Sequence, residues 1–403
     1  MSAREGFIRV PYGMSVHGEE EIAAVVDVLR TSTQMGKNVK EFEGQVAGLF
    51  AKKHGIMVNS GSSALLLAAE ILSLAPGSEV ITPALTFSTT VSSLLKNDLV
   101  PAFVDVEEAT YCINPNRIEE MISPDTRAVS VPNLIGNVAL WDRIHEIARR
   151  HHLAIIEDSA DTLGATLNGK PTGYYSDISV TSFYGSHIIN CAGNGGMLCV
   201  NDDEWARRAK LLRSWGRSSS LFAESENIEN RFDVSIDGLE YDAKFLFEAQ
   251  GYNLEASELG AAFGLVQLQK LEQNIEARLR NFQAQLDFFS QYEDWFMLPK
   301  QTLGSRSGWL AFPLTIRPNA PFSRKELQIF FEERNIQTRV IFTGNVTRQP
   351  GFSGISMKTS ERGYPVSDRA MRGGFLLACH HGLTPEMLAH IHRTFEDFTR
   401  LPR

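Results

Sequence analysis

The stretch AVSVPNLIGNVALWDRIHEIARRHHLAIIEDSA, residues 128–160, holds the strongest evidence for the fold class. Two short apolar runs, AVSVPNL at 128–134 and LAIIEDSA at 153–160, lie on either side of DRIHEIARRHH, in which apolar residues recur near helical spacing. Runs that are apolar on both faces predict strands buried within a sheet. The stretch therefore predicts a strand, a helix and a second strand that form one β-α-β unit.

The same alternation continues from about residue 55 to 200. Further apolar runs are GIMV from residue 55, EVITPA from 79, VPAFVDV from 100 and MLCV from 197, while SALLLAAEIL from 63 has helix-like spacing. Strands separated by helices predict an α/β fold with a mainly parallel sheet that is covered on both faces. Ligands of such sheets bind at the carboxyl ends of the strands.

The character of the sequence changes after residue 200. DDEWARRAKLLRSWG predicts a charged helix, and SSSLFAESENIENRFDVSIDG predicts a polar, acid-rich loop. A long helix-like run then extends from Ser257 to about Phe289. Because 403 residues exceed what one compact core usually takes, we expect two domains whose boundary lies along this run. The large domain, with an N-terminal helix, would cover residues 1–270 and the small C-terminal domain residues 271–403.

Composition argues against several classes of protein. Hydrophobic residues make up 43% and charged residues 22% of the chain, as in ordinary globular enzymes. The formal net charge is -9 and the basic residues are scattered, which argues against a nucleic-acid binder and a membrane-surface protein. No stretch approaches the roughly 18 apolar residues of a membrane span, and the first residues lack the apolar core of a signal peptide. We therefore expect a cytoplasmic protein.

The four cysteines give no support for a metal site. Cys112, Cys191, Cys199 and Cys379 form no CxxC pair and have no dense spacing. This pattern argues against a disulfide framework, a zinc site and an iron–sulfur cluster. We expect buried, reduced thiols.

Two motifs at predicted strand ends could bind charged groups. Asn59-Ser60-Gly61-Ser62-Ser63 precedes a predicted helix, where free amides and hydroxyls suit a phosphate monoester, although an ordinary Ser/Gly turn has the same composition. Glu157 and Asp158 end a buried strand, where a carboxylate needs a partner. A protonated pyridine nitrogen is one such partner, and a backbone amide or an arginine is another.

Two further features lie at the same predicted edge of the sheet. TSFYGSHIINCAGNGG, from residue 181, brings Ser182, a possible phosphate ligand, and His187, five residues later. Phe87 follows another strand and could lie flat on an aromatic ring. Taken singly, a loop histidine is more often structural and a phenylalanine more often part of the core.

Together, four motifs in this order resemble the nucleotide-sugar aminotransferase family of fold type I pyridoxal-phosphate (PLP) enzymes. The motifs are SGSSA, EDSADTLGA, SFYGSH followed by GNGGM, and GYNLEASELGAAFGLVQL. The resemblance extends from MSVHGEEEIAAVVDVL to RGGFLLACHHGL. It implies an α/β fold, with a mainly parallel seven-stranded sheet in the large domain and a smaller C-terminal α/β domain.

The resemblance also implies roles for individual residues. Asp158 would pair with the pyridine nitrogen of the cofactor, and Phe87 would stack on its ring. Ser62, Ser63 and Ser182 would bind the phosphate of the cofactor. Asn253, in GYN, would reach the phosphate in a neighbouring subunit, which implies a homodimer with a shared active site.

The chain departs from the aminating members of this family at His187. Those members have a lysine at this position, whereas no lysine occurs between Lys170 and Lys210 here. The histidine variant resembles the 3-dehydratases of 4-keto-6-deoxy sugars, which remove the C3 hydroxyl on the way to 3,6-dideoxyhexoses. In those enzymes an acid stands at the position of Asp161 and contacts the ring hydroxyl of the cofactor, where aminotransferases carry glutamine.

The 3-dehydratases are of two kinds. The CDP-4-keto-6-deoxyglucose enzyme carries an iron–sulfur cluster and works with a reductase, whereas the GDP-4-keto-6-deoxymannose enzyme has no cluster and takes its amino group from glutamate. The tracts SWGRSSSLFAES and TRVIFTGNVTRQPGF are similar to the first kind. The cluster cysteines are absent, however: Ser218, Ser219 and Ser220 follow SWGR, and Phe263 stands where another thiol is expected.

The resemblance therefore implies a cluster-free 3-dehydratase with pyridoxamine phosphate (PMP) as the reacting form of the cofactor. Its substrate would be a nucleotide-linked 4-keto-6-deoxy sugar, its amino donor glutamate and its base His187, because imidazole moves protons but forms no Schiff base. No feature supports a reductase partner. The alternatives are a related PLP enzyme of antibiotic or deoxysugar biosynthesis and a non-catalytic relative that keeps only the fold.

Four other polar residues are candidates for substrate contact. Asn133 and Asn137, in PNLIGN, follow a predicted strand and could face the ligand or stabilise the loop. Arg339 could pair with a carboxylate or a sugar phosphate, or lie in solvent. His380 could border the sugar site, with less support than His187.

Overall fold

The computed structural model describes residues 6–222 and 228–402, without the side chain of Asn230. Part of the predicted acid-rich loop, residues 223–227, lies outside the described residues. No helix in the described part is long and apolar enough to cross a membrane.

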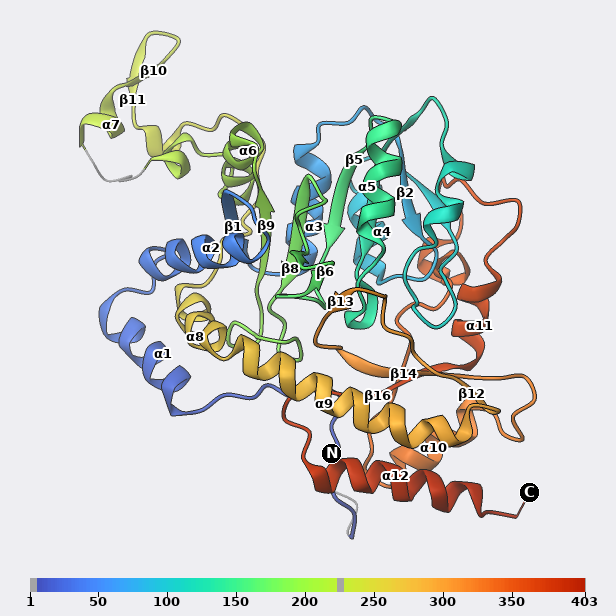
Figure 1. Cartoon of the computed structure of the whole chain (residues 1–403). Helices are drawn as coiled ribbons and strands as arrows, with labels where there is room; N and C mark the ends of the chain where they lie inside the picture. The colour runs from blue at the N-terminus through green and yellow to red at the C-terminus, as the bar shows by residue number, and fades with distance from the viewer. Residues whose placement is uncertain (1–5, 223–227, 403) are drawn as a thin grey trace.

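A seven-stranded sheet forms the centre of the larger part of the molecule (Figure 1). Its strands are β1 (His54–Val58), β2 (Glu79–Pro83), β3 (Val100–Val104), β4 (Thr126–Pro132), β5 (Ala154–Asp158), β8 (Ile178–Ser182) and β9 (Gly196–Val200). They lie in the order β1-β9-β8-β5-β4-β2-β3. The neighbours from β3 to β8 are parallel, and β9 is antiparallel to both β8 and β1. The mainly parallel sheet expected from the apolar runs is thereby confirmed.

Helices follow the strands in the expected alternation. They are α3 (Gly61–Ile71), α4 (Ser88–Leu95), α5 (Trp141–Arg150) and α6 (Asp203–Arg213). The unit β4-α5-β5 is the one that the opening stretch predicts. Trp141, Ile144, Ile147 and Ala148 form the buried face of α5, as the helical spacing requires. Parallel pairing of β4 with β5 then places the ends of both strands, Pro132 and Asp158, side by side.

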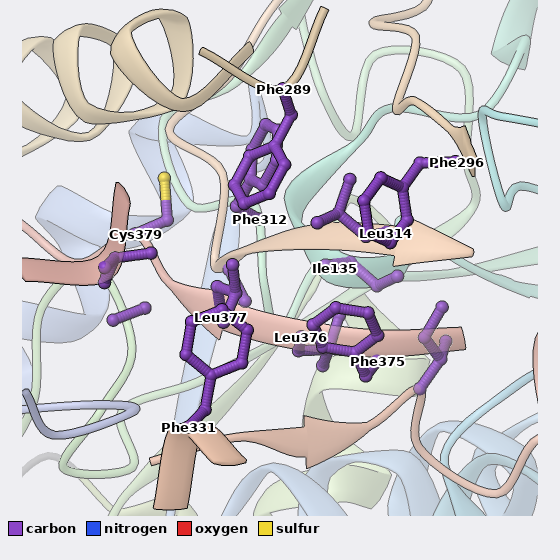
Figure 2. Packing of buried hydrophobic residues seen from close by; sticks show 14 of the residues in the cluster. Ile135, Phe289, Phe296, Phe312, Leu314, Phe331, Phe375, Leu376, Leu377 and Cys379 are labelled. Carbon is purple, nitrogen blue, oxygen red and sulfur yellow. The ribbon is translucent and has the colours of Figure 1, made fainter. Parts of the chain in front are cut away.

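A second, antiparallel sheet lies in the C-terminal part, in the order β12-β14-β16-β15. Its strands are β12 (Phe296–Met297), β14 (Ala311–Ile316), β15 (Arg339–Val340) and β16 (Gly374–Ala378), with helices α10 (Arg324–Glu332), α11 (Pro365–Gly373) and α12 (Pro385–Thr399). Its core is aromatic: Phe289, Phe296, Phe312 and Phe375 pack around β14 and β16 (Figure 2). Burial of these rings supplies a large apolar area for a small sheet.

The long helix-like run is two helices, α8 (Glu258–Gln269) and α9 (Leu271–Phe289), which meet at Lys270. In Figure 1, α9 runs from the larger sheet to the C-terminal sheet. The chain also contacts the C-terminal part near its start, because Val10 pairs with Ile336. The proposed boundary between residues 270 and 271 stays a prediction.

The remaining elements are peripheral. Helices α1 (Glu19–Thr31) and α2 (Lys37–Leu49) precede β1, and β6 (Thr166–Leu167), β7 (Lys170–Pro171) and β13 (Ser305–Arg306) form a small sheet. An arm made of α7 (Ile228–Phe232), β10 (Val234–Ile236) and β11 (Leu239–Tyr241) projects away from the rest of the chain (Figure 1).

Candidate active site

A cavity of about 370 Å3 opens at the carboxyl ends of β4, β5 and β8. The three strand ends contribute Pro132, Asp158 and Ser182. The start of α3 forms a second wall, and Leu310 and Phe342 from the C-terminal part close the cavity from the opposite side. This is the edge at which the parallel sheet was expected to bind a ligand.

One end of the cavity suits a phosphate group. Ser60 caps α3 by accepting a hydrogen bond from the amide of Ser63 at 3.1 Å, so the amides of Gly61 and Ser62 stand first in the helix, without intrahelical partners. Gly61 lies against Ser182, where an added Cβ would come within 2.7 Å of the serine Cβ. The helix start and the hydroxyls of Ser62 and Ser182 therefore meet in one place, where they favour an anion.

Ser63 differs from the other predicted phosphate ligands. It is not among the lining residues, and its hydroxyl donates to Asn59 Oδ1 at 2.6 Å. Its contact with the Ser60 hydroxyl, at 3.0 Å, also lies within the turn. Ser63 thus completes the helix cap, and any contact with a ligand would require another rotamer.

Asp158 is a buried acid with few partners. One carboxylate oxygen accepts a hydrogen bond from the amide of Ala160 at 3.1 Å, and the other accepts from the hydroxyl of Thr90 at 3.2 Å. Burial raises the pKa of Asp158 to about 6. Among the described residues no cationic side chain forms an ion pair with it, so its carboxylate can accept a positively charged group from a ligand.

Asp161 and His187 face each other across the cavity wall, with His187 Nε2 3.9 Å from Asp161 Oδ1. Burial and the neighbouring Asp158 raise the pKa of Asp161 to about 7, while the amide of Ile135 donates to its Oδ2. Burial lowers the pKa of His187 to about 4, which keeps the imidazole neutral near pH 7.

The hydrogen bonds of His187 assign its tautomer. Nδ1 lies 3.3 Å from the carbonyl oxygen of Ser182, which can only accept, so Nδ1 carries the proton. Nε2 then has a free lone pair and can accept a proton. Among the described residues that line the cavity there is no lysine, so His187 is the basic side chain in it.

Aromatic rings form part of the cavity lining. Phe87, the residue before α4, is 49% exposed and contacts the ring of Phe342 edge to face at 5.9 Å. Tyr12 comes from the N-terminal segment, and the guanidinium of Arg339 lies over its ring at 5.4 Å. A planar ligand could be covered by Phe87.

The other predicted substrate residues lie less directly on the cavity. Asn133 lines it, but its amide is fully used: it donates to Glu157 and Ser159 and accepts from Ala139 and Trp141. Asn137 lies outside the cavity lining and bonds to backbone groups of Thr110, Val138, Lys300 and Thr302, the pattern of a loop-stabilising residue. His380 is fully buried, with Nε2 on the carbonyl of Pro11, and does not line the cavity.

Two predicted residues are not among those that line this cavity. Arg339 reaches it only through the ring of Tyr12. Asn253 is exposed and pairs through its backbone with Ser214, outside the lining of its own chain's cavity. A role for Asn253 at a neighbouring subunit is compatible with this position and stays a prediction.

The predicted sites did not include several residues of the cavity and its surroundings. Tyr12, Leu310 and Phe342 come from distant parts of the chain, so no local motif connects them with the strand ends. Thr90 belongs to α4, and only the structure shows that its hydroxyl donates to Asp158.

The cysteines and the serines after SWGR lie apart from the cavity. All four cysteines are buried, free thiols. Ser218 donates to the carbonyl of Ala243 near the arm. In the described ranges, no three His, Cys, Asp or Glu side chains are grouped so that they could hold a metal ion.

Comparisons with a family model and with known proteins point to the same family. The model of the DegT/DnrJ/EryC1/StrS aminotransferase family matches residues 15–396. A dTDP-4-dehydro-2,6-dideoxy-D-glucose 3-dehydratase from Saccharopolyspora spinosa is 36% identical over 96% of this chain and 86% of that protein. A GDP-4-keto-6-deoxy-D-mannose 3-dehydratase from Yersinia pseudotuberculosis is 32% identical over 85% and 86%.

Solved structures agree with the sequence relatives. The E. coli GDP-4-keto-6-deoxy-D-mannose-3-dehydratase with bound hydrated PLP has a TM-score of 0.87 and 27% identity, over 96% of this chain and 99% of that chain. A GDP-4-keto-6-deoxymannose-3-dehydratase with a trapped PLP-glutamate geminal diamine has a TM-score of 0.86 and 26% identity over the same shares.

Proposed function

Since the chain belongs to the DegT/DnrJ/EryC1/StrS aminotransferase family, we propose that it is a PLP/PMP-dependent 3-dehydratase of a nucleotide-linked 4-keto-6-deoxyhexose. The observation that carries this proposal is a cofactor-sized cavity in which His187 is present and a lysine is absent from the described lining. Relatives named as 3-dehydratases, at 36% and 32% identity, support the same reaction class.

The residues of the cavity fit the cofactor. Asp158, a buried carboxylate without a cationic partner among the described residues, would pair with the pyridinium nitrogen. The start of α3 with Ser62 and Ser182 would hold the phosphate, Phe87 would cover the ring and Asp161 would lie near the ring hydroxyl. Two solved relatives bound to PLP forms support this assignment.

When bound, the aminated cofactor supplies an amine that condenses with the C4 ketone of the sugar and a ring that accepts an electron pair. The net change balances: the C3 hydroxyl of the sugar leaves as water and C3 is reduced to a methylene. The aminated cofactor would supply the two electrons for this reduction, and its amino nitrogen would be released as ammonia. The product therefore has one oxygen atom fewer than the substrate.

The chain's own residues would direct this outcome through proton transfer. His187 holds its Nδ1 proton on the carbonyl of Ser182, so Nε2 is the atom that accepts a proton from the reacting carbon. Asp161 beside Nε2 would stabilise the imidazolium formed in this step. Asp158 would keep the ring nitrogen protonated.

The proposal includes glutamate as amino donor, a homodimer and a cytoplasmic location. A related dehydratase with a trapped PLP-glutamate geminal diamine supports glutamate. The apolar side chains exposed on and beside the arm, Phe232, Leu239, Phe245 and Phe247, support a subunit contact. Four free buried cysteines suit a reducing compartment.

Product analysis tests the reaction class. The purified protein, loaded with PMP and supplied with glutamate, would be incubated separately with GDP-, CDP- and dTDP-linked 4-keto-6-deoxyhexoses. We expect ammonia release and a sugar that lacks the C3 oxygen. An amino sugar as the main product would favour the aminotransferase alternative, and a protein that binds no added PMP would favour the non-catalytic one.

A further inference from the structure

Helix α9 contacts the loop that carries His187 through two side chains one turn apart. Arg278 Nη2 donates to the carbonyl oxygens of Ser186 at 3.2 Å and His187 at 3.0 Å. Asn274 Nδ2 donates to the next carbonyl, that of Ile188, at 3.0 Å. Residues four apart on a helix share a face, so both side chains bind consecutive carbonyls of the same loop.

The guanidinium of Arg278 is fully used at this site. Nη1 donates to the carbonyls of Trp309 and Leu310 at 3.0 and 3.2 Å, and Nε donates to His381 Nδ1 at 3.3 Å. Leu310 lines the cavity, so Arg278 ties the His187 loop to the opposite cavity wall. A planar fork with five donors makes these bonds at once, which an ammonium group cannot do.

The charge of Arg278 has no carboxylate partner in the described ranges. The side chain is fully buried. Asp161 is the acid that acts on it electrostatically, but the two side chains form no ion pair. A buried cation that is bonded only to neutral groups is costly to desolvate. Its charge also opposes protonation of neighbouring groups such as His187.

We propose that Arg278 is a positioning residue for the reaction described above: it fixes the loop that aims His187 Nε2 into the cavity, and its charge, together with burial, favours the neutral, proton-accepting form of the imidazole. The proposal rests on the proposed function of His187 as base. Asn274 extends the same clamp to Ile188.

Several groups around the imidazole bear on its protonation. They are Asp161, 3.9 Å from Nε2, the carbonyl of Ser182 on Nδ1, the ring of Tyr184 and, behind the loop, Arg278, with Tyr12 on the same cavity. Asp161 favours the imidazolium and Arg278 opposes it. Loss of the arginine charge therefore shifts the balance toward the protonated ring.

Two substitutions separate position from charge. Arg278→Lys keeps the charge and loses the fork, whereas Arg278→Gln loses the charge and keeps a planar amide with two of the five donors. Arg280→Gln, on the exposed side of the same helix, is the matched control. In PMP-loaded protein with 13C-labelled histidine, the titration of His187, assigned with His187→Asn, is followed by NMR, and single-turnover rates are measured with the sugar nucleotides used above.

We expect the titration midpoint of His187 to rise in Arg278→Gln and to stay in place in Arg278→Lys and Arg280→Gln. The turnover rate falls about 100-fold in Arg278→Lys, because the loop loses its position. An unchanged midpoint in Arg278→Gln, or a wild-type rate in Arg278→Lys, overturns the proposal. If wild-type protein converts none of the sugars while the midpoints behave as expected, the proposed function fails and the placement of Arg278 stands.

If the Arg278 variants do not fold, Asn274→Ala tests whether α9 positions the His187 loop. This partly exposed residue loses one hydrogen bond to the loop, so we expect a stable protein with a shifted His187 ring resonance and a rate lowered several-fold. An unshifted resonance together with a wild-type rate would show that α9 does not position His187.

Discussion

Replacement of Asp158 by Asn should have opposite effects on the cofactor-free and the cofactor-bound protein. Asp158 is 5% exposed, and its carboxylate accepts hydrogen bonds only from the amide of Ala160 and the hydroxyl of Thr90. Without a cation, its charged form is therefore poorly solvated in the folded state. With a pyridinium present, the same charge becomes the anchor of the ring.

The magnitude follows from the pKa. A rise from 3.8 in the unfolded chain to about 6 in the fold corresponds to about 3 kcal/mol, at about 1.4 kcal/mol per pH unit. Because the folded pKa is the higher one, this penalty is absent below about pH 4 and complete above about pH 6. Cofactor-free Asp158→Asn protein should thus gain up to about 3 kcal/mol of unfolding free energy at pH 8 and little at pH 4.

Cofactor affinity should change in the other direction. Loss of a charged hydrogen bond to the ring nitrogen removes roughly 2 to 3 kcal/mol, which weakens PMP binding on the order of 100-fold. The amide of asparagine can still accept from Ala160, so the local backbone should keep its place. One substitution therefore stabilises the empty protein and weakens its complex.

Urea unfolding at pH 4 and pH 8 measures the first effect, and titration with PMP, followed by its fluorescence, measures the second. Glu157→Gln is the matched control: this neighbouring buried acid is bonded to Ser159 and Gly173 and does not line the cavity. It should leave PMP affinity unchanged. Asp158→Asn protein that is less stable at pH 8 and binds PMP normally would refute the assignment.

Three further predictions concern the same cavity. His187→Lys protein incubated with PLP and reduced with borohydride should gain the mass of the cofactor on residue 187, whereas wild type should gain none at any cavity residue; a modified wild-type lysine would contradict the role of His187. Gly61→Ala should lower the unfolding free energy by about 1 to 3 kcal/mol and weaken PMP binding, because the new Cβ would lie 2.7 Å from Ser182, while Gly44→Ala, with open space around it, should do neither. Cofactor-free wild-type protein should lose stability as the pH rises from about 4 to about 7, because burial and Asp158 raise the pKa of Asp161 to about 7, and Asp161→Asn should make this loss smaller; urea midpoints that keep the wild-type pH dependence would count against this.

The sequence predicts the central sheet well because its strands are buried on both faces. A run such as AIIED, 154–158, is apolar whatever its neighbours, so β5 and the unit β4-α5-β5 can be predicted without tertiary information. The break between α8 and α9 at Lys270 could not be predicted, since no Gly or Pro marks it and apolar spacing continues through it.

The candidate site likewise contains residues that the sequence predicts and residues that it does not. Asp158, Ser182 and His187 belong to local motifs at strand ends, where one strand fixes the position of each. Tyr12 and Phe342 enter the cavity through packing between distant segments, which local patterns do not encode.

Asn137 shows a second limit of sequence reasoning. An amide in a strand-end loop suits a ligand and a backbone carbonyl equally. The loop here has Ile135 at φ 62° and Gly136 at φ 93°, and the Asn137 side chain that follows this turn bonds to backbone groups of distant segments, at Thr110, Lys300 and Thr302. Its role as a bracing residue is visible only once this turn is built.

The composition of the sugar product tests the central claim most directly. Wild-type protein loaded with PMP would be mixed, for a single turnover, with a nucleotide-linked 4-keto-6-deoxyhexose that it converts. The isolated sugar would be reduced and its mass measured by mass spectrometry. We predict a sugar with one oxygen atom fewer at C3 and no nitrogen, together with one equivalent of ammonia. A sugar that retains its C3 oxygen and carries an amine at C4 would contradict the proposal that His187 directs elimination.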